Sequence, residues 1–145
     1  MNVQVAVLCD AATDEYGKLN LLGAFDTIYA PQLPVLHPQC SVALRVTFMG
    51  GDEGKHNLQL NFVDADGRSI TPDFPPMPLE VVLPGEMHFS TRNFIVNFQQ
   101  LKFEHPGVYS IDVSIDGRQL TSIPLMVKHH PSATVEQAGA GHGDG

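Results

Sequence analysis

Apolar and polar residues alternate one by one near the end of the chain, where residues 109–115 read YSIDVSI. A period of two is typical of a β-strand with one buried side and one side facing solvent. Asp116-Gly117 follows directly, and both residue types tolerate positive φ, so this dipeptide predicts a type I′ turn into a second strand. Residues 104–127 therefore predict a turn followed by a β-hairpin.

The same alternation recurs along the chain and predicts about nine strands. Turn signals separate the runs at intervals close to the roughly 8–12 residues expected of a sandwich. No amphipathic helical window of useful length occurs. We therefore expect an all-β fold, an immunoglobulin-like two-sheet antiparallel sandwich of seven to nine strands, spanning residues 1–128. Besides the hairpin, the expected strands lie at residues 3–9, 18–29, 41–49, 57–63, 68–71, 79–83 and 94–98.

Two details of the N-terminal half follow from the same pattern. Residues 10–17, DAATDEYG, interrupt the alternation and predict a polar connection. Residues 18–29 predict one strand, in which Gly23 marks a bend or a bulge. The prolines that follow at 31, 34 and 38 predict a loop or an edge crossing.

The segment Gly107-Val108-Tyr109 resembles the tyrosine corner of immunoglobulin-like sandwiches, in which a Tyr near the start of the penultimate strand bonds back to the backbone. Ile111 stands where antibody-type domains have a Cys, and the chain has no Trp. The resemblance therefore extends to the sandwich architecture and not to an antibody-type domain. We expect a buried hydrogen bond from the Tyr109 hydroxyl.

Residues 129–145 read HHPSATVEQAGAGHGDG and carry little apolar surface. Such a segment cannot offset the entropy lost on ordering, so we expect a disordered C-terminal tail. The full length of 145 residues fits a single domain with its own core.

The net charge and the first residues of the chain limit the expected binding partners and cellular location. Eight Lys and Arg against 16 Asp and Glu give a net charge of −8, which would repel nucleic acid and anionic membranes on average. The first residues carry neither the positive charge nor the long apolar run of a signal peptide. No segment approaches the length of a membrane span. We expect a cytoplasmic protein.

Cys9 and Cys40 are the two cysteines. Cys9 falls in phase with Val3, Val5 and Val7, and Cys40 with the apolar residues of 42–46, so both are expected to face inward as buried thiols. A single Cys9–Cys40 disulfide is the alternative. A catalytic thiolate is disfavoured, because no basic neighbour in sequence would lower the pKa of either thiol.

The remaining motifs carry little chemistry. Residues 64–67, DADG, invite a calcium hypothesis, but the further oxygen ligands are missing and a hairpin turn is favoured. The seven histidines follow no zinc-binding spacing. The PxxP spacings predict stiff crossovers rather than ligands for aromatic grooves. Nucleophile elbows and phosphate loops are absent from the sequence, and no cofactor or metal is predicted.

Cys9-Asp10 and the later block GKLNLLGAFDTI, residues 17–28, resemble the opening of a family of small uncharacterised bacterial β-sandwich proteins. The resemblance covers roughly residues 1–128, and this block is its specific part. It implies the fold and a bacterial origin, and it implies no activity, because none is assigned to the family.

We therefore expect a non-enzymatic binding or protein-interaction module on a β-sandwich scaffold, with an unknown protein as its partner. The alternatives are a hydrolase-like enzyme with a site assembled from loops, and a structural subunit of a homo-oligomer that pairs edge strands. The polar residues beside the apolar positions of 18–29 form the expected interaction surface: Lys18, Asn20 and Asp26.

Overall fold

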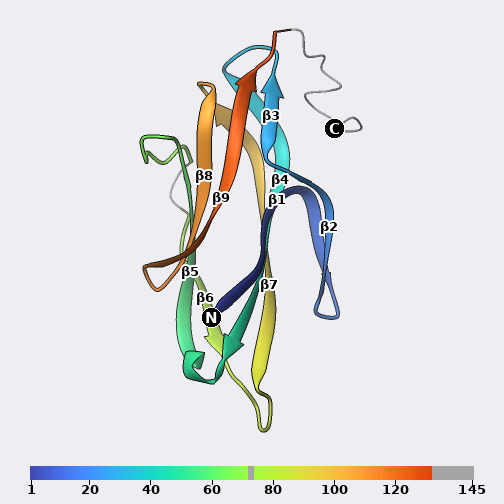
Figure 1. Cartoon of the computed structure of the whole chain (residues 1–145), viewed down its shortest axis with the longest axis vertical. Helices are drawn as coiled ribbons and strands as arrows, with labels where there is room; N and C mark the ends of the chain where they lie inside the picture. The colour runs from blue at the N-terminus through green and yellow to red at the C-terminus, as the bar shows by residue number, and fades with distance from the viewer. Residues whose placement is uncertain (72–73, 132–145) are drawn as a thin grey trace.

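The computed structural model describes residues 1–71 and 74–131, which form nine strands and no α-helix (Figure 1). One sheet has the strand order β2-β1-β4-β7, and the other has the order β3-β9-β8-β5-β6. An all-β fold in two sheets is thus confirmed. The elements are β1 (Asn2–Glu15), β2 (Lys18–Phe25), β3 (Thr27–Ala30), β4 (Val35–Met49), the 3-10 turn η1 (Gly50–Asp52), β5 (Gly54–Val63), β6 (Met77–Val81), β7 (Phe89–Phe103), β8 (Gly107–Ile115) and β9 (Arg118–His129).

The core lies between the two sheets. Every second residue of β4, β5, β8 and β9 points into it, as the alternation predicts. The largest buried side chains are Phe48, Phe62 and Phe103, which come from both sheets. The ring of Phe62 meets Phe98 and Phe103 edge to face at 5.8 and 5.9 Å, an arrangement that favours aromatic pairs.

Two predictions about the last hairpin are confirmed. Asp116 and Gly117 have φ values of 53° and 80°, as a type I′ turn requires. The hydroxyl of Tyr109 donates a hydrogen bond of 2.6 Å to the backbone carbonyl of His105, four residues earlier. The start of β8 is therefore hydrogen-bonded to the loop that precedes it.

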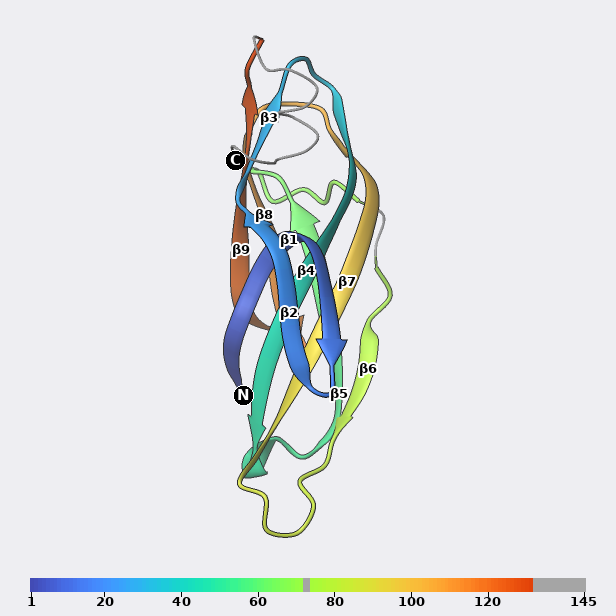
Figure 2. The ribbon, with the colours of Figure 1, turned by 90° about the vertical axis from the view of Figure 1, so that its right-hand side faces the viewer.

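The expected polar connection at residues 10–17 is wrong. β1 continues to Glu15, a two-residue turn follows, and β2 returns beside it. Tyr16 and Gly17 have φ values of 54° and 81°, so this turn is also of the type I′ kind. We call residues 10–25 the hairpin arm. It folds back over the outer face of the first sheet, across β4 and β7 (Figure 2).

The single strand expected at residues 18–29 is two strands in different sheets. The bend predicted at Gly23 is present, with φ of 69°, but the chain leaves the first sheet at Asp26. The carbonyl of Asp26 accepts a hydrogen bond of 2.8 Å from the amide of Met126. β3 then pairs in parallel with β9, so the expectation of antiparallel pairing throughout is wrong for these two strands.

The expected inward phase of Cys9 is also wrong. A β-bulge between Val3 and Val5 shifts the register of β1 against β4. Beyond it Cys9 pairs with Ser41, on the outer face of the sheet, while Leu8 pairs with Val42 in the core. Cys9 is buried nevertheless, and its Sγ donates to the Ser41 carbonyl at 3.6 Å.

Two other segments differ from expectation. The return strand predicted at residues 68–71 is reduced to one isolated bridge, Val63 with Ser69. The core strand predicted at 94–98 is the middle of the longer β7. Of the expected tail at 129–145, His129 ends β9 and the amide of His130 donates to the carbonyl of Ala30 at 2.8 Å. Residues 132–145 lie outside the described residues.

Candidate functional site

The three residues of the expected interaction surface lie along β2 and just beyond its end, and they do not converge. Lys18 and Asn20 face solvent on the hairpin arm, and the Asn20 amide donates to Thr13 Oγ1 at 3.3 Å and to Glu15 Oε1 at 3.1 Å. Asp26 follows the far end of β2, and its Oδ1 accepts a hydrogen bond of 2.9 Å from Thr27. Eight residue-to-residue steps of extended chain lead from Lys18 to Asp26, a distance of up to about 26 Å. Within one chain they form no common site.

A polar layer beneath the arm fixes its position. Arg45, on the outer face of β4, donates to Gln4 Oε1 at 2.9 Å, to the Gly17 carbonyl at 2.9 Å and to Asn93 Oδ1 at 2.8 Å. The Asn93 amide in turn donates to Asp14 Oδ2 and to the Gly17 carbonyl, both at 3.1 Å. The tip of the arm is therefore held by charge-assisted bonds. The sequence analysis missed this role of Arg45; a charged residue in the middle of an otherwise apolar strand was the available signal.

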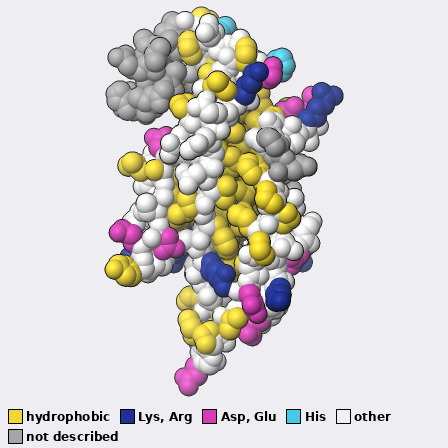
Figure 3. Space-filling view, turned by 180° about the vertical axis from the view of Figure 1, so that it is seen from behind, with side chains coloured by type: hydrophobic (Ala, Val, Ile, Leu, Met, Phe, Trp, Pro, Cys, Tyr) yellow, Lys and Arg dark blue, Asp and Glu magenta, His cyan; other side chains and the backbone are white. Residues whose placement is uncertain are grey.

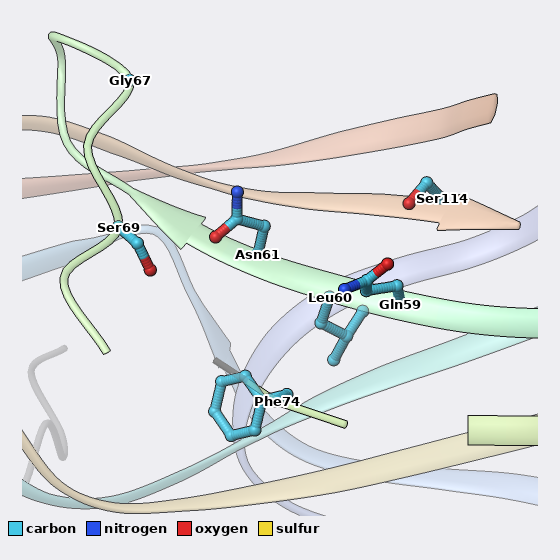
Figure 4. Close-up of a pocket in the computed structure, with 7 residues that line it drawn as sticks. All are labelled: Gln59, Leu60, Asn61, Gly67, Ser69, Phe74 and Ser114. Atoms are coloured by element: carbon cyan, nitrogen blue, oxygen red, sulfur yellow. The ribbon is translucent and has the colours of Figure 1, made fainter. Parts of the chain in front are cut away.

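A groove of about 310 Å³ lies along β5, between this strand and the segment that follows it (Figure 4). It is lined by residues of β5 and β8 and of the segment that follows β5: Gln59, Leu60, Asn61, Ser114, Gly67, Ser69 and Phe74. The polar groups are amides and hydroxyls, which can bind a ligand by hydrogen bonds. Because no lining residue titrates near neutral pH, the groove supplies no acid or base for catalysis.

The Asp64-Ala65-Asp66-Gly67 segment is a hydrogen-bonded turn, as favoured from the sequence. Asp64 Oδ1 accepts bonds of 2.9 Å from the amides of Asp66 and Arg68, so this carboxylate is used by its own loop. Among residues 1–71 and 74–131, no three His, Cys, Asp or Glu side chains are placed to hold a metal ion.

A histidine network joins three segments at one end of the molecule. His56 Nδ1 lies 2.6 Å from Asp116 Oδ2, and its Nε2 lies 2.6 Å from the carbonyl of Asp52. The hydrogen bond to Asp116 raises the pKa of His56, and the same contact lowers the pKa of Asp116. A carbonyl can only accept, so Nε2 carries a proton and cannot act as the base of a catalytic triad. The His56–Asp116 pair therefore has a structural role, and together with the bond to Asp52 we call it the latch.

Both cysteines are free and buried, as predicted. Burial raises the pKa of both thiols, that of Cys40 to about 12, so neither is a nucleophile at neutral pH. The ring of His37 lies 5.6 Å from that of Phe25. Its Nε2 is buried and has no hydrogen-bond partner in the described part of the chain. Burial lowers the pKa of His37.

Four large apolar side chains gather at the same end as the β6–β7 connection, and each is more than half exposed. Met49 and Phe89 are cross-strand neighbours at the ends of β4 and β7. Val82 and Met87 belong to residues 82–88, between β6 and β7, where the Met87 amide donates to the Pro84 carbonyl at 3.2 Å. We call these four residues the end patch, and Figure 3 shows hydrophobic side chains gathered near the lower end of the molecule. Apolar residues inside a proline-rich connection were the sequence signal for it.

These features define a two-sheet all-β protein whose described residues offer exposed apolar surface and strand edges rather than an assembled catalytic centre. The chain belongs to a family of unknown function (DUF6941), whose model matches residues 4–128. This confirms the resemblance to an uncharacterised family without an assigned activity. None of the curated proteins compared with the chain matches it. The described residues contain no helix that is long and apolar enough to cross a membrane.

Proposed function

We propose that the protein is a non-enzymatic protein-interaction module that binds its partner through the end patch. The observation that carries this proposal is the exposure of Met49, Val82, Met87 and Phe89 at one end of the molecule. A folded chain gains by burying such side chains, and exposed apolar clusters on soluble proteins commonly mark interaction sites. Methionine adds an adaptable surface, because its unbranched side chain fits irregular partners.

Hydrogen bonds hold the segments that carry the end patch in place. Glu53 Oε1 accepts a hydrogen bond of 3.4 Å from the Leu83 amide, which ties the β6–β7 connection to the turn before β5. The Arg92 guanidinium bonds to the Glu80 carbonyl and so links β7 to β6 across the open side between the sheets. A partner would therefore meet a surface that is largely formed in advance, which lowers the entropy cost of binding.

A hydrolase-like enzyme receives less support. His56 Nε2, the nitrogen that would serve a nucleophile, is occupied by the Asp52 carbonyl. The groove on β5 is lined by amides and hydroxyls without a carboxylate or imidazole. Turnover of generic ester or peptide substrates that is lost on substituting groove residues would favour the enzyme instead.

We further propose an immunoglobulin-like assignment for the fold. In support, the order β9-β8-β5-β6 matches the G-F-C-C′ order of variable-type domains, and Tyr109 near the start of β8 bonds back to the backbone as in a tyrosine corner. The hairpin arm and the parallel β3 are additions to that plan. An experimental structure that separated β8 from β5 would contradict the assignment.

We propose a protein partner in the bacterial cytoplasm rather than nucleic acid or an anionic membrane. The net charge of −8 supports this choice, because a polyanion would meet a repulsive surface. Retention on heparin or on phosphatidylserine vesicles at physiological salt would contradict it.

A double substitution tests the end patch. Met49→Ser with Phe89→Ser removes a cross-strand apolar pair from the patch, and Val108→Ser with Met126→Ser removes a similar exposed pair at the opposite end. We expect a partner that co-purifies stoichiometrically with the tagged protein and with the Val108/Met126 control, and that is reduced at least about tenfold with the patch variant. Equal recovery with both variants would overturn the proposal, and so would the absence of any stoichiometric partner.

A further inference from the structure

The free edge of the hairpin arm is a second exposed surface, on a different part of the molecule. β2 is the last strand of its sheet, and among the described residues it pairs with β1 alone. The type I′ turn at Tyr16-Gly17 makes Glu15 and Lys18 a hydrogen-bonded pair, and the pairing alternates from there. Leu19, Leu21 and Phe25 therefore direct their backbone groups away from β1, toward the free edge.

This edge lacks the usual protection against strand pairing. Edge strands commonly carry prolines or several charges that prevent another strand from adding. β2 has no proline, and Lys18 is its one charged residue. Leu22 is 69% exposed and Leu21 is 41% exposed. Gly23 is exposed as well, and a strand glycine allows another backbone to approach closely.

The charges of β2 are complementary to those of the same strand turned end for end. Lys18 opens β2 and Asp26 follows its last residue, and both are exposed. An antiparallel pairing about a two-fold axis at Leu22 would place Lys18 of each copy opposite Asp26 of the other. It would also set Leu22 against Leu22 as a non-hydrogen-bonded pair, about 4.5 Å apart at Cα. Within the described chain Lys18 has no ion-pair partner.

We propose that two copies of this chain associate through antiparallel pairing of their β2 strands, centred on Leu22. The pairing joins the two arms into a four-stranded ribbon with the order β1-β2-β2-β1. Arg45 and Asn93 hold the arm tip through the Gly17 carbonyl, so the edge is presented in a fixed position. This interface is isologous and closes after two copies. It shares no residue with the end patch, so either proposal can fail alone.

A charge-swap series tests the pairing in the full chain. Light scattering and sedimentation across a range of concentrations should give the mass of a dimer. Lys18→Asp alone and Asp26→Lys alone place like charges opposite each other twice, and we expect each to raise the dimer dissociation constant about tenfold or more. Because the combined variant restores opposite charges, it should recover most of the affinity. Leu22→Glu should give a monomer, and Leu36→Glu, at an exposed leucine of β4, should not.

A cross-link provides a readout that does not depend on affinity. Leu22→Cys places two thiols within disulfide range across the two-fold axis, and the native thiols of Cys9 and Cys40 are buried. Mild oxidation should yield a covalent dimer from Leu22→Cys and none from Leu36→Cys. Thermal melts check that each variant is folded. A monomer at all concentrations, a dimer insensitive to Leu22→Glu, or failure of Leu22→Cys to cross-link would each overturn the proposal.

Discussion

Gly23 is the residue at which β2 leaves regular strand geometry. A Cβ atom placed there would lie 2.4 Å from Asp10 Oδ2, and its φ of 69° disfavours any residue with a side chain. The bend was predictable from the glycine alone. Its cause was not, because the approach of Asp10 depends on the pairing of β1 with β2.

Tyr109 shows how one polar group is satisfied at the edge of the core. Its ring meets Phe103 at 5.1 Å, and its hydroxyl reaches the His105 carbonyl. We expect Tyr109→Phe to lower the free energy of unfolding by about 1–2 kcal/mol, because the carbonyl loses its partner while the ring still packs. Chemical denaturation measures this change. Tyr16→Phe, at a fully exposed tyrosine, is the control and should change stability little; an unchanged midpoint for Tyr109→Phe would contradict the expectation.

The face of the sheet on which Cys9 lies could not be predicted from the alternation of residues alone. A strict period of two places it with Val3, whereas the bulge at Val3/Val5 moves it to the opposite face. A bulge adds one residue to one strand, and its presence depends on the partner strand rather than on local composition. The prediction that Cys9 is buried is nevertheless confirmed, although the inward phase on which it was based is wrong.

At the scale of elements, the hairpin arm is what the sequence failed to predict. Strands with a buried face were found because apolar residues alternate in them, as in residues 107–115. Residues 10–15 become a strand for a different reason. They pair with β2 and expose much of their length, so they carry no apolar period to detect. The role of Arg45 was missed for a similar reason. Arg45 contacts Gly17 across 28 positions of the chain, and a local sequence pattern cannot show such a contact.

The arm depends on Arg45, and this can be tested. Arg45→Ala removes the charged donor that bonds Gly17, Asn93 and Gln4. We expect amide hydrogen exchange in residues 11–22 to accelerate about tenfold or more, since a lost bond to a charged group corresponds to roughly 1.5–3 kcal/mol of local stability. Lys102→Ala removes an exposed ion pair with Glu104 and should leave these amides unchanged. Equal exchange in both variants would show that the arm is held by other contacts.

At the scale of the whole molecule, the two sheets are joined by a core in the middle and by side-chain bonds at the ends. The latch at His56 connects the 3-10 turn, β5 and the turn between β8 and β9. Asp116 contributes further, because its Oδ1 accepts a bond of 2.9 Å from the Asn57 amide. Since the hydrogen bond to Asp116 raises the pKa of His56 above its ordinary value, this end of the molecule should respond to pH.

The direction of that response follows from the two pKa shifts. The pKa of His56 is raised on folding, so its contribution is complete below the unfolded value, about 6.5, and is lost as the pH rises through the folded value. The pKa of Asp116 is lowered, so its contribution is present above about 3.9 and is lost as the pH falls through its folded value. The latch should therefore stabilise the fold most between about pH 4 and 6.5.

We expect the difference in unfolding free energy between the protein and His56→Gln to be larger at about pH 5.5 than at about pH 8.5. Glutamine keeps a polar side chain at the position but cannot carry the positive charge that faces Asp116. Urea unfolding at the two pH values measures the difference. His88→Gln, at an exposed histidine between β6 and β7, corrects for the general loss of one imidazole. A gap between protein and His56→Gln that stays constant across this range would mean that His56 holds the end of the molecule as a neutral ring, through its bond to Asp52 alone.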